Sequence, residues 1–243
     1  MRTRVTTANI ASTLPDAAIR ADFAAAAAGT DILCTQEDHQ RDSAKYLPAG
    51  WATVQFKGGS KGRCAIHYRT ALFAEISRRS LLLNLANGLT FPGARRDAVV
   101  VRLQDKRNGK IVKVTSAHFV PHADDDENPG VLTPMPRGVK AVIPAIASLA
   151  DDSETDPADV EVIGADVNDD IDRDLAIHDN GMLERFNAAG FRSDVQQLGA
   201  TPDTHGTNEY DWLLVKGAGK WVGHETRAKK HSDHRAKTAV AEY

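Results

Sequence analysis

The chain has 243 residues, of which 42% are hydrophobic and 26% charged, and its formal net charge is −3. This length can bury a large core in one domain, or at most two, and we predict a single domain over residues 1–243. The slightly negative net charge excludes a global field that favours nucleic acid, so a polyanionic substrate would need a local basic patch.

Membrane insertion and secretion are not expected from this sequence. No apolar run reaches membrane-spanning length, and the alanine run Ala24–Ala28 is far too short. The first ten residues, MRTRVTTANI, contain no apolar signal core, so a cytoplasmic location is the default expectation. Cys34 and Cys64 both lie in apolar, strand-like runs, and we expect them to be buried free thiols.

The first elements follow a strand–helix–strand order. Val5–Ile10 has the composition of a strand, with the polar Asn9 near its end. Asp16–Ala28 is alanine-rich with a helical pattern, and Asp31–Thr35 is a second strand followed closely by Glu37. This order predicts a parallel pair of strands joined by the helix.

Four more strands are expected next, over Trp51–Phe56, Arg63–Arg69, Ala71–Leu83 and Ala98–Leu103. The glycine-rich segment Lys57–Arg63 carries three basic residues. It is either a solvated hairpin loop or a contact to a phosphate backbone. Arg95 and Arg96 stand just before the last of the four strands.

The middle of the chain alternates between a strand, a loop and a helix. Ile111–Phe119 has alternating polarity and carries His118 near its end. Pro121–Gly138 is acidic and proline-rich, which indicates a long surface loop. Gly138–Leu149 places its apolar residues on one helical face, and Asp151–Asp159 is expected to be a polar connector.

The most informative stretch is Val160–Asp170, which reads VEVIGADVNDD. A β-branched run predicts a strand, in which Gly164 would allow close backbone approach. Alternation would turn Asp166 and Asn168 to one side and Val167 into the protein. A carboxylate beside an amide can hold a water or a phosphate oxygen. The same residue types are also common turn formers, so both interpretations stay open.

The remaining elements expected are a helix over Leu183–Ala189 and strands over Tyr210–Val215 and Ala236–Val240. Asp211 stands at the start of the first of these strands. Ser232, Asp233 and His234 precede the last strand.

Six polar sites thus lie at or near strand ends, and we list them in chain order: Asn9, Glu37, His118, Asp166 with Asn168, Asp211, and Asp233 with His234. Each alone is weak. The set, carried by the segments TANI, TQE, TSAHF, GADVN, YDWLL and SDH, resembles the endonuclease/exonuclease/phosphatase superfamily, whose fold is deoxyribonuclease I-like. The resemblance spans the chain and implies an α/β (α+β) fold, a four-layer sandwich of two packed mixed β-sheets flanked by helices.

The resemblance also implies a metal site and an activated water. Glu37 would be the main Mg²⁺ ligand, with Asn9 close to the metal and Asp233 as a second-metal or auxiliary ligand. Asp166 would orient or deprotonate the attacking water, and Asn168 would position the water and the phosphate. Carboxylate and amide oxygens are hard ligands that suit Mg²⁺, with Mn²⁺ as a possible substitute.

In the same comparison, His118 and His234 would contact the scissile phosphate, and Asp211 would pair with His234 and favour its charged form. One feature departs from the deoxyribonuclease I branch. The segment SKGRCAIHYR contains no acid that could partner His118, so that partner stays open. A zinc site is not expected, because the chain has neither a C-x-x-C pair nor an H-E-x-x-H helix.

Members of this superfamily cut DNA, RNA, inositol phosphates and sphingomyelin, so the fold does not settle the substrate. The basic residues around the SDH segment are Arg227, Lys229, Lys230 and Arg235. With Arg96 as a substrate-binding residue, they would form a phosphate-binding rim, unless they are ordinary surface charges.

These observations predict a Mg²⁺-dependent phosphodiesterase, a DNA endonuclease of low sequence specificity, that acts without a membrane or an obligate protein partner. One alternative is a phosphatase or phospholipid phosphodiesterase acting on a small phosphorylated substrate. The other is a non-catalytic member of the fold that binds nucleic acid.

Overall fold

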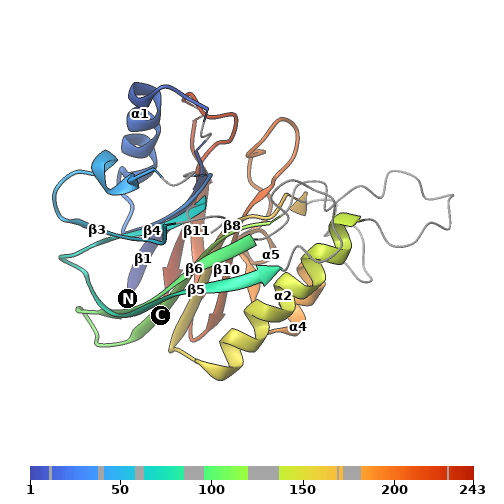
Figure 1. The fold of residues 1–243 in the computed structure, drawn as a ribbon. Helices are drawn as coiled ribbons and strands as arrows, with labels where there is room; N and C mark the ends of the chain where they lie inside the picture. Colours follow the sequence, from blue (N-terminus) through green and yellow to red (C-terminus); the bar gives the residue numbers. More distant parts are fainter. Residues whose placement is uncertain are drawn as a thin grey trace, which may run out of the picture.

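The computed structural model describes residues 1–10, 13–37, 41–57, 63–84, 96–119, 137–168, 170–171, 182–228 and 230–243. Their strands form two six-stranded sheets (Figure 1). Sheet 1 has the order β11-β12-β1-β2-β4-β3, and its strands are β1 (Arg2–Asn9), β2 (Ile32–Gln36), β3 (Trp51–Gln55), β4 (Cys64–Arg69), β11 (Lys220–Thr226) and β12 (Lys237–Glu242). Sheet 2 has the order β5-β6-β7-β8-β10-β9, and its strands are β5 (Phe73–Asn84), β6 (Arg96–Asp105), β7 (Ile111–His118), β8 (Val160–Asp166), β9 (Arg192–Ser193) and β10 (Asp211–Gly217).

Both sheets are mixed, and each contains one parallel pair. In sheet 1, β1 runs parallel to β2, with Val5 opposite Ile32. In sheet 2, β7 runs parallel to β8, while β8 is antiparallel to β10. The parallel pair predicted from the strand–helix–strand order at the N-terminus is therefore confirmed. Parallel strands end at the same edge of a sheet, so β1, β2, β7 and β8 carry their last residues to one end of the molecule.

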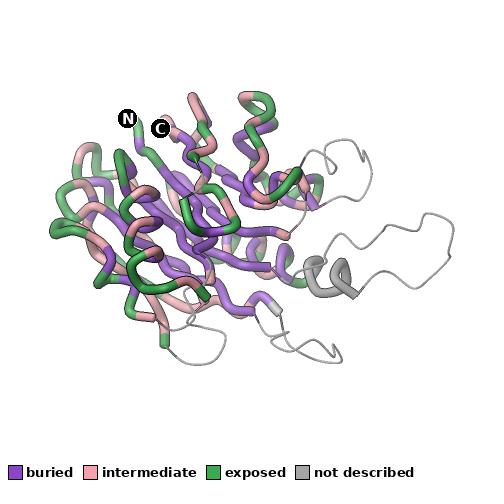
Figure 2. Tube along the Cα trace, turned by 90° about the horizontal axis from the view of Figure 1, so that it is seen from above, coloured by how far each residue is buried: buried purple, intermediate pink, exposed green. Residues whose placement is uncertain are grey.

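The main core lies between the two sheets. It combines Val5, Ile32 and Ile66 of sheet 1 with residues such as Val114 and Val162 of sheet 2, all 1% exposed or less. Buried positions accordingly follow the strands in Figure 2, and exposed positions lie on the outer helices and loops. Both cysteines are buried free thiols, as predicted.

Helices cover the outer face of each sheet. On sheet 1, α1 (Asp16–Ala27) packs Ile19 and Phe23 against Leu33. On sheet 2, α2 (Arg137–Thr155) and α4 (Met182–Ala188) pack against residues that include Trp212. The order helix, sheet, sheet, helix is the four-layer sandwich predicted from the sequence. Two shorter elements, η1 (Ser43–Tyr46) and α5 (Asp194–Leu198), complete the described part of the fold.

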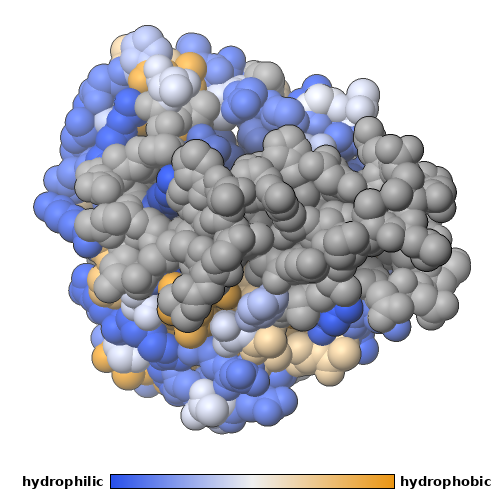
Figure 3. Space-filling model, turned by 45° about the vertical axis from the view of Figure 1, so that its right-hand side comes forward, coloured by the Kyte–Doolittle hydropathy of each residue, from blue (hydrophilic) through white to orange (hydrophobic). Residues whose placement is uncertain are grey.

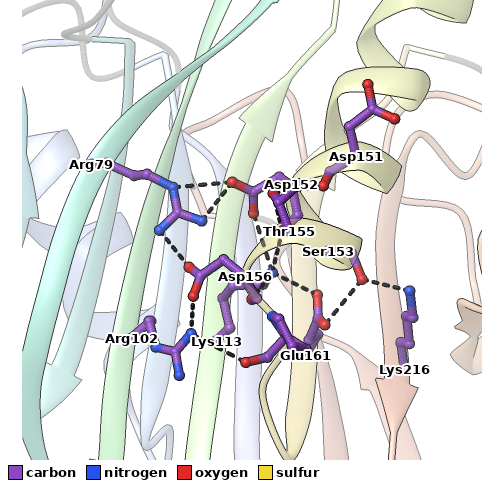
Figure 4. A network of polar contacts seen from close by, with 11 residues as sticks. Arg79, Arg102, Lys113, Asp151, Asp152, Ser153, Thr155, Asp156, Glu161 and Lys216 are labelled. Atoms are coloured by element: carbon purple, nitrogen blue, oxygen red, sulfur yellow. Dashed lines mark hydrogen bonds and ion pairs between the residues drawn. The ribbon is translucent and has the colours of Figure 1, made fainter.

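The helix α2 extends further than the sequence suggested. It continues to Thr155, so the first part of the predicted connector Asp151–Asp159 is helical. The reason is a network of ion pairs between this end of α2 and basic residues on the outer face of sheet 2 (Figure 4). Asp152 pairs with Arg79 at 2.5 Å and with Lys113 at 3.2 Å. Acidic residues that look like a solvated linker in the sequence are therefore partners of strand residues.

Four described elements were not predicted: η1, β9, α5 and β11. The strand β11 lies at the edge of sheet 1, where partial exposure removes the clean apolar alternation of a core strand. The helix α5 has only five residues, too few for a helical period, and a capping box between Ser193 and Gln196 begins it.

Few large hydrophobic side chains reach the described surface. Met1 and Ile76 are the exposed ones among the residues that the structure describes. On the face shown in Figure 3, the coloured surface is mostly hydrophilic, and hydrophobic residues stand in small separate groups. Within the described ranges, none of the helices has the length and apolar character needed to cross a membrane.

Candidate active site at the strand ends

The nine sequence-predicted site residues all belong to the described part of the chain, and they come from both sheets. Asn9 ends β1, and Glu37 directly follows β2. His118 ends β7 opposite Asp166, which ends β8. Asp211 begins β10, also opposite Asp166, because β8 and β10 are antiparallel. The sandwich thus brings residues more than 200 positions apart to one end of the two sheets.

Asp166 lies at the centre of this group and is 1% exposed. Its Oδ2 accepts a hydrogen bond from Asn9 Nδ2 at 2.7 Å and lies 3.5 Å from His118 Nε2. Its Oδ1 accepts a hydrogen bond from the backbone N–H of Asn168 at 3.0 Å. The acidic neighbour of His118 that the sequence left open is therefore Asp166 itself.

The surroundings of Asp166 disfavour its charged form. Burial, and then the negative charge of Asp211, raise the pKa of Asp166 to about 7, against the opposing effects of His234, Asn9 and Asn168. Burial acts because a carboxylate loses its hydration, and Asp211 acts because two like charges repel. A carboxylate with a pKa near neutrality is suited to accept a proton at neutral pH.

Asn168 reaches Asp166 in a different way from the one predicted. The strand ends at Asp166, and Asn168 has a φ of 55°, in the left-handed region, so the alternation does not continue to it. Its backbone N–H, and not its side chain, contacts Asp166, while its Nδ2 donates to the Phe119 carbonyl oxygen at 3.1 Å. Val167 is fully buried, as predicted. The turn interpretation of this segment is thus confirmed, and its role in a site stays a prediction.

His234 and Asp211 form a buried pair. His234 Nδ1 lies 2.7 Å from Asp211 Oδ2, and the side chains are 9% and 0% exposed. Burial alone would lower the pKa of His234, but the attraction and hydrogen bond of Asp211, with smaller contributions from Asp166 and Asp233, raise it to about 9. The imidazole is therefore charged at neutral pH, and its Nε2 is left for a ligand.

The loop that carries His234 is tied to both β1 and α1. Ser232 Oγ donates to the Asn9 carbonyl oxygen at 2.8 Å. The carboxylate of Asp22, which is 7% exposed on α1, accepts the backbone N–H groups of His231 and Ser232 at 3.0 and 2.9 Å. Asp22 has no place in the sequence prediction, because a single acid on a helix carries no signal of a contact more than 200 residues away.

Asn9 and Glu37 stand at the ends of neighbouring strands and offer oxygen donors that fit a hard divalent cation. Asn9 is opposite Gln36, the last residue of β2, which places Glu37 next to it. Asn9 Oδ1 is buried and has no hydrogen-bond partner among the described residues. Glu37 has a φ of 61°, an uncommon conformation that turns the chain at the strand end. An orphaned buried amide oxygen beside a carboxylate matches the ligands of Mg²⁺ or Mn²⁺.

Arg96 is a buried residue and not part of a surface rim. It is 7% exposed, and within the described structure its Nε and Nη1 have no hydrogen-bond partner. Burial and the charge of Arg63 lower the pKa of Arg96 to about 10, although Asp166 and Glu37 attract its charge. It therefore lies within electrostatic reach of both site carboxylates and remains charged at neutral pH.

Other basic residues of the predicted rim behave differently. Arg227 donates to the carbonyl oxygens of Ala25 and Ala26 at 2.8 and 2.9 Å, so it caps the end of α1. Arg235 is exposed and contacts the Asp203 carbonyl oxygen at 3.4 Å. Arg95, Lys229 and residues 58–62 of the predicted basic loop lie outside the described residues, as does most of the acidic loop over residues 121–138.

The sequence analysis also missed His205, which lies in the same region. Its ring lies 4.6 Å from the His234 ring and stacks on Tyr210 at 5.6 Å, measured between ring centroids. Its Nε2 lies 3.7 Å from Asp233 Oδ2. His205 stands in an irregular segment before β10 and has no strand-end pattern, so only the fold reveals its position.

Comparison with known proteins identifies this architecture. No protein-family model and no curated protein matches the sequence. Solved structures do match: an endonuclease/exonuclease/phosphatase family protein from Bacteroides thetaiotaomicron aligns with 99% of this chain and 95% of its own, at a TM-score of 0.73 and 15% identity. The chain has the endonuclease/exonuclease/phosphatase fold.

Two other proteins of known structure share this fold with the chain and have more specific descriptions. A mannosyl-6-phosphatase from Bacteroides thetaiotaomicron aligns with 99% of this chain and 100% of its own, with a TM-score of 0.71 and 15% identity. TDP2 from D. rerio, in complex with a single-strand DNA product, aligns with 100% and 99%, with a TM-score of 0.69 and 10% identity. At these identities the endonuclease/exonuclease/phosphatase fold is shared, and the reaction has to be argued from the site.

Proposed function

We propose that the chain is a Mg²⁺-dependent phosphodiester hydrolase that cuts DNA with low sequence specificity. The observation that carries this proposal is the environment of Asp166. A buried carboxylate with a pKa of about 7 contacts Asn9, lies beside His118 and faces the Asp211–His234 pair. This combination supplies a proton acceptor and charged or polar groups for a phosphate within one site.

In the proposed reaction, Asp166 takes a proton from a water as the water oxygen attacks phosphorus. A new P–O bond forms while the bond to the leaving oxygen breaks. Asn168, at the turn after β8, would hold the water and the phosphate. His118 and the charged His234 would stabilise the negative charge that builds up on the phosphoryl oxygens. Asp211 keeps His234 oriented and protonated through the 2.7 Å contact to Nδ1.

We assign Glu37 and Asn9 to the cation, with Asp233 as an auxiliary ligand. Bound there, Mg²⁺ or Mn²⁺ would act as a Lewis acid on the phosphoryl oxygen. Arg96 adds a second positive charge from inside the protein. Its Nε and Nη1 have no hydrogen-bond partner among the described residues and can each donate to a phosphate oxygen.

DNA is the proposed substrate class because the site offers groups suited to a phosphodiester and a protein of the same fold was solved in complex with a single-strand DNA product. One observation favours the alternative, a phosphatase or phospholipid phosphodiesterase on a small substrate. Arg227, expected on a basic rim, is committed to capping α1. Fewer free cations at the rim leave less charge for a long phosphate backbone.

Supercoiled plasmid nicking tests the proposal in Mg²⁺, in Mn²⁺ and in EDTA. We expect metal-dependent nicking by the wild type and its loss in Asp166→Asn and His234→Ala. The matched control is Asp105→Asn, the same chemical change in a buried carboxylate at the far end of β6. If a folded wild type leaves the plasmid intact in every metal, the DNA assignment is wrong.

The same proteins would then be tested on sugar phosphates, inositol phosphates and sphingomyelin. Metal-dependent turnover of one of these, lost in Asp166→Asn, would establish the small-substrate alternative. Salt-dependent DNA binding without turnover of any substrate would instead indicate the non-catalytic alternative.

A further inference from the structure

Three side chains that can bind a metal lie together at the rim of the site, where the ring of His205 lies beside the ring of His234. Within the described structure, His205, Asp233 and His234 can each offer one ligand atom, and these atoms lie within 4.8 Å of one another. The group combines two imidazoles with one carboxylate. It differs from the Asn9 and Glu37 pair, which offers oxygen atoms alone.

We propose that His205, Asp233 and His234 form a binding site for Zn²⁺ or a similar late transition metal, which differs from the Asn9 and Glu37 pair proposed for Mg²⁺ and shares only the auxiliary ligand Asp233 with it. Two imidazoles and a carboxylate, with a fourth position open to water, are a ligand set that zinc accepts. Imidazole nitrogen suits Zn²⁺, whereas Mg²⁺ prefers oxygen. The site was not expected from the sequence because His205 and His234 stand far apart in the chain and form no short zinc motif.

The distances are compatible with such an ion after small side-chain movements. Two ligands of a tetrahedral zinc, with bonds of about 2.0–2.1 Å, lie roughly 3.4 Å apart. His205 Nε2 and Asp233 Oδ2 are 3.7 Å apart. Asp233 is 61% exposed and His205 is 38% exposed, so both can adjust, and an ion can reach them from solvent.

The third ligand is already held in the orientation that metal-binding histidines usually have. Asp211, which is fully buried, binds His234 Nδ1 at 2.7 Å. His234 would therefore bind the metal through Nε2, with a carboxylate behind it, and the metal would displace the Nε2 proton of the charged imidazole into solvent. Such carboxylate–histidine–metal arrangements fix the ring and strengthen the ligand. The ring of His205 stacks on the ring of Tyr210, and this contact restricts its orientation.

The proposal has a consequence for the reaction that rests on the proposed function. His234 Nε2 is the atom assigned to the scissile phosphate, so a zinc ion on that nitrogen and a bound substrate exclude each other. Zn²⁺ is therefore expected to inhibit the enzyme in the presence of excess Mg²⁺. Zinc binding itself needs no turnover and can be measured whether or not the chain hydrolyses DNA.

Equilibrium dialysis against Zn²⁺ in excess Mg²⁺, with metal counted by mass spectrometry, tests the site directly. Glu37→Gln removes the proposed Mg²⁺ ligand and should retain one bound zinc. His205→Gln and Asp233→Asn should each weaken this zinc by at least about 10-fold. His231→Gln is the matched control, since His231 lies on the same loop but pairs with Asp22. The visible spectrum of bound Co²⁺ should show a tetrahedral site that is lost in His205→Gln.

Equal zinc stoichiometry and affinity in wild type, His205→Gln and Asp233→Asn would overturn the proposal. Circular dichroism and thermal unfolding show whether each variant is folded, and the two ligand variants serve as independent tests. A chain that binds zinc through His205 but cuts no substrate would refute the proposed function and leave the metal site intact. Metal-dependent nicking without His205-dependent zinc binding would refute the zinc site and leave the proposed function intact.

Discussion

Asp211→Asn is expected to change two pKa values at once. Asp211 binds His234 Nδ1 at 2.7 Å and faces Asp166 across the β8–β10 pair. In the wild type, burial lowers the pKa of His234. The attraction of nearby carboxylates, chiefly Asp211, outweighs this effect and raises the pKa to about 9. Burial and the charge of Asp211 together raise the pKa of Asp166 to about 7. Without that charge, the pKa of His234 should fall toward its ordinary value of 6.5, because burial lowers it and only the smaller attractions of Asp166 and Asp233 remain. The pKa of Asp166 should fall as well.

The magnitude follows from the change at His234. The difference between the ordinary pKa of 6.5 and about 9 corresponds to roughly 3 kcal/mol, at about 1.4 kcal/mol per pH unit. Because the pKa is higher in the folded protein, this stabilisation is fully present below pH 6.5 and is lost as the pH rises through about 9. In Asp211→Asn the free energy of unfolding should therefore not fall in this way between pH 6.5 and 9. Urea unfolding at a series of pH values measures this free energy for both proteins.

The assay is a pH–rate profile of phosphodiester cleavage with an NMR titration of the histidine rings. Wild-type activity should rise through about pH 7 as Asp166 ionises and fall above about pH 9 as His234 loses its proton. In Asp211→Asn both limbs should move to lower pH, so activity at pH 8 should fall by roughly 30-fold, which is the loss of protonated His234 when its pKa falls from about 9 to 6.5. The control Asp105→Asn breaks contacts to Arg107 and Tyr243 far from the site, so its profile should keep the wild-type limbs. A His234 that still titrates near pH 9 in Asp211→Asn would refute the reasoning.

Three further substitutions test the packing and the charges. In Gly164→Ala the new Cβ would lie 2.8 Å from Cys34 Cβ, so the free energy of unfolding should fall by about 1–3 kcal/mol in urea, and Cys34→Ala should restore only part of it because that Cβ remains. Lys113→Met leaves the buried Glu161 and the partly buried Asp152 of the network in Figure 4 without this cation and should cost about 3–5 kcal/mol, whereas Lys45→Met, in an exposed pair, should cost much less. Arg96→Met should lower kcat/KM by about 10- to 100-fold, mainly through KM, and Arg96→Lys should recover part of the loss.

Each of these expectations has a contradicting result. A wild-type midpoint in Gly164→Ala would mean that the two sheets can separate at this point without cost. Equal losses in Lys113→Met and Lys45→Met would mean that burial does not decide the value of these ion pairs. An unchanged KM in Arg96→Met would remove this residue from the substrate site.

The sequence by itself determined which strands reach the site. The β-branched run before Asp166, the polar Asn9 at the end of a strand and the acid after Asp31–Thr35 are local patterns, and local patterns report periodicity and burial. The parallel pairing of the first two strands then followed from connectivity, because a strand–helix–strand unit favours a parallel pair. The resemblance drawn from these strand ends predicted the Asp211–His234 contact, which the structure contains.

Only the tertiary structure decided which side chains meet and how burial and neighbouring charges shift their pKa values. The neighbour of His118 is Asp166, the contact of Asn168 is its backbone N–H, and Arg96 is buried. His205 joins the site from an irregular segment that carries no strand pattern. These facts depend on how two sheets pack and on how much water reaches each group. Neither is encoded in the spacing of residues along the chain, because distance through space and the loss of hydration arise only when the layers come together.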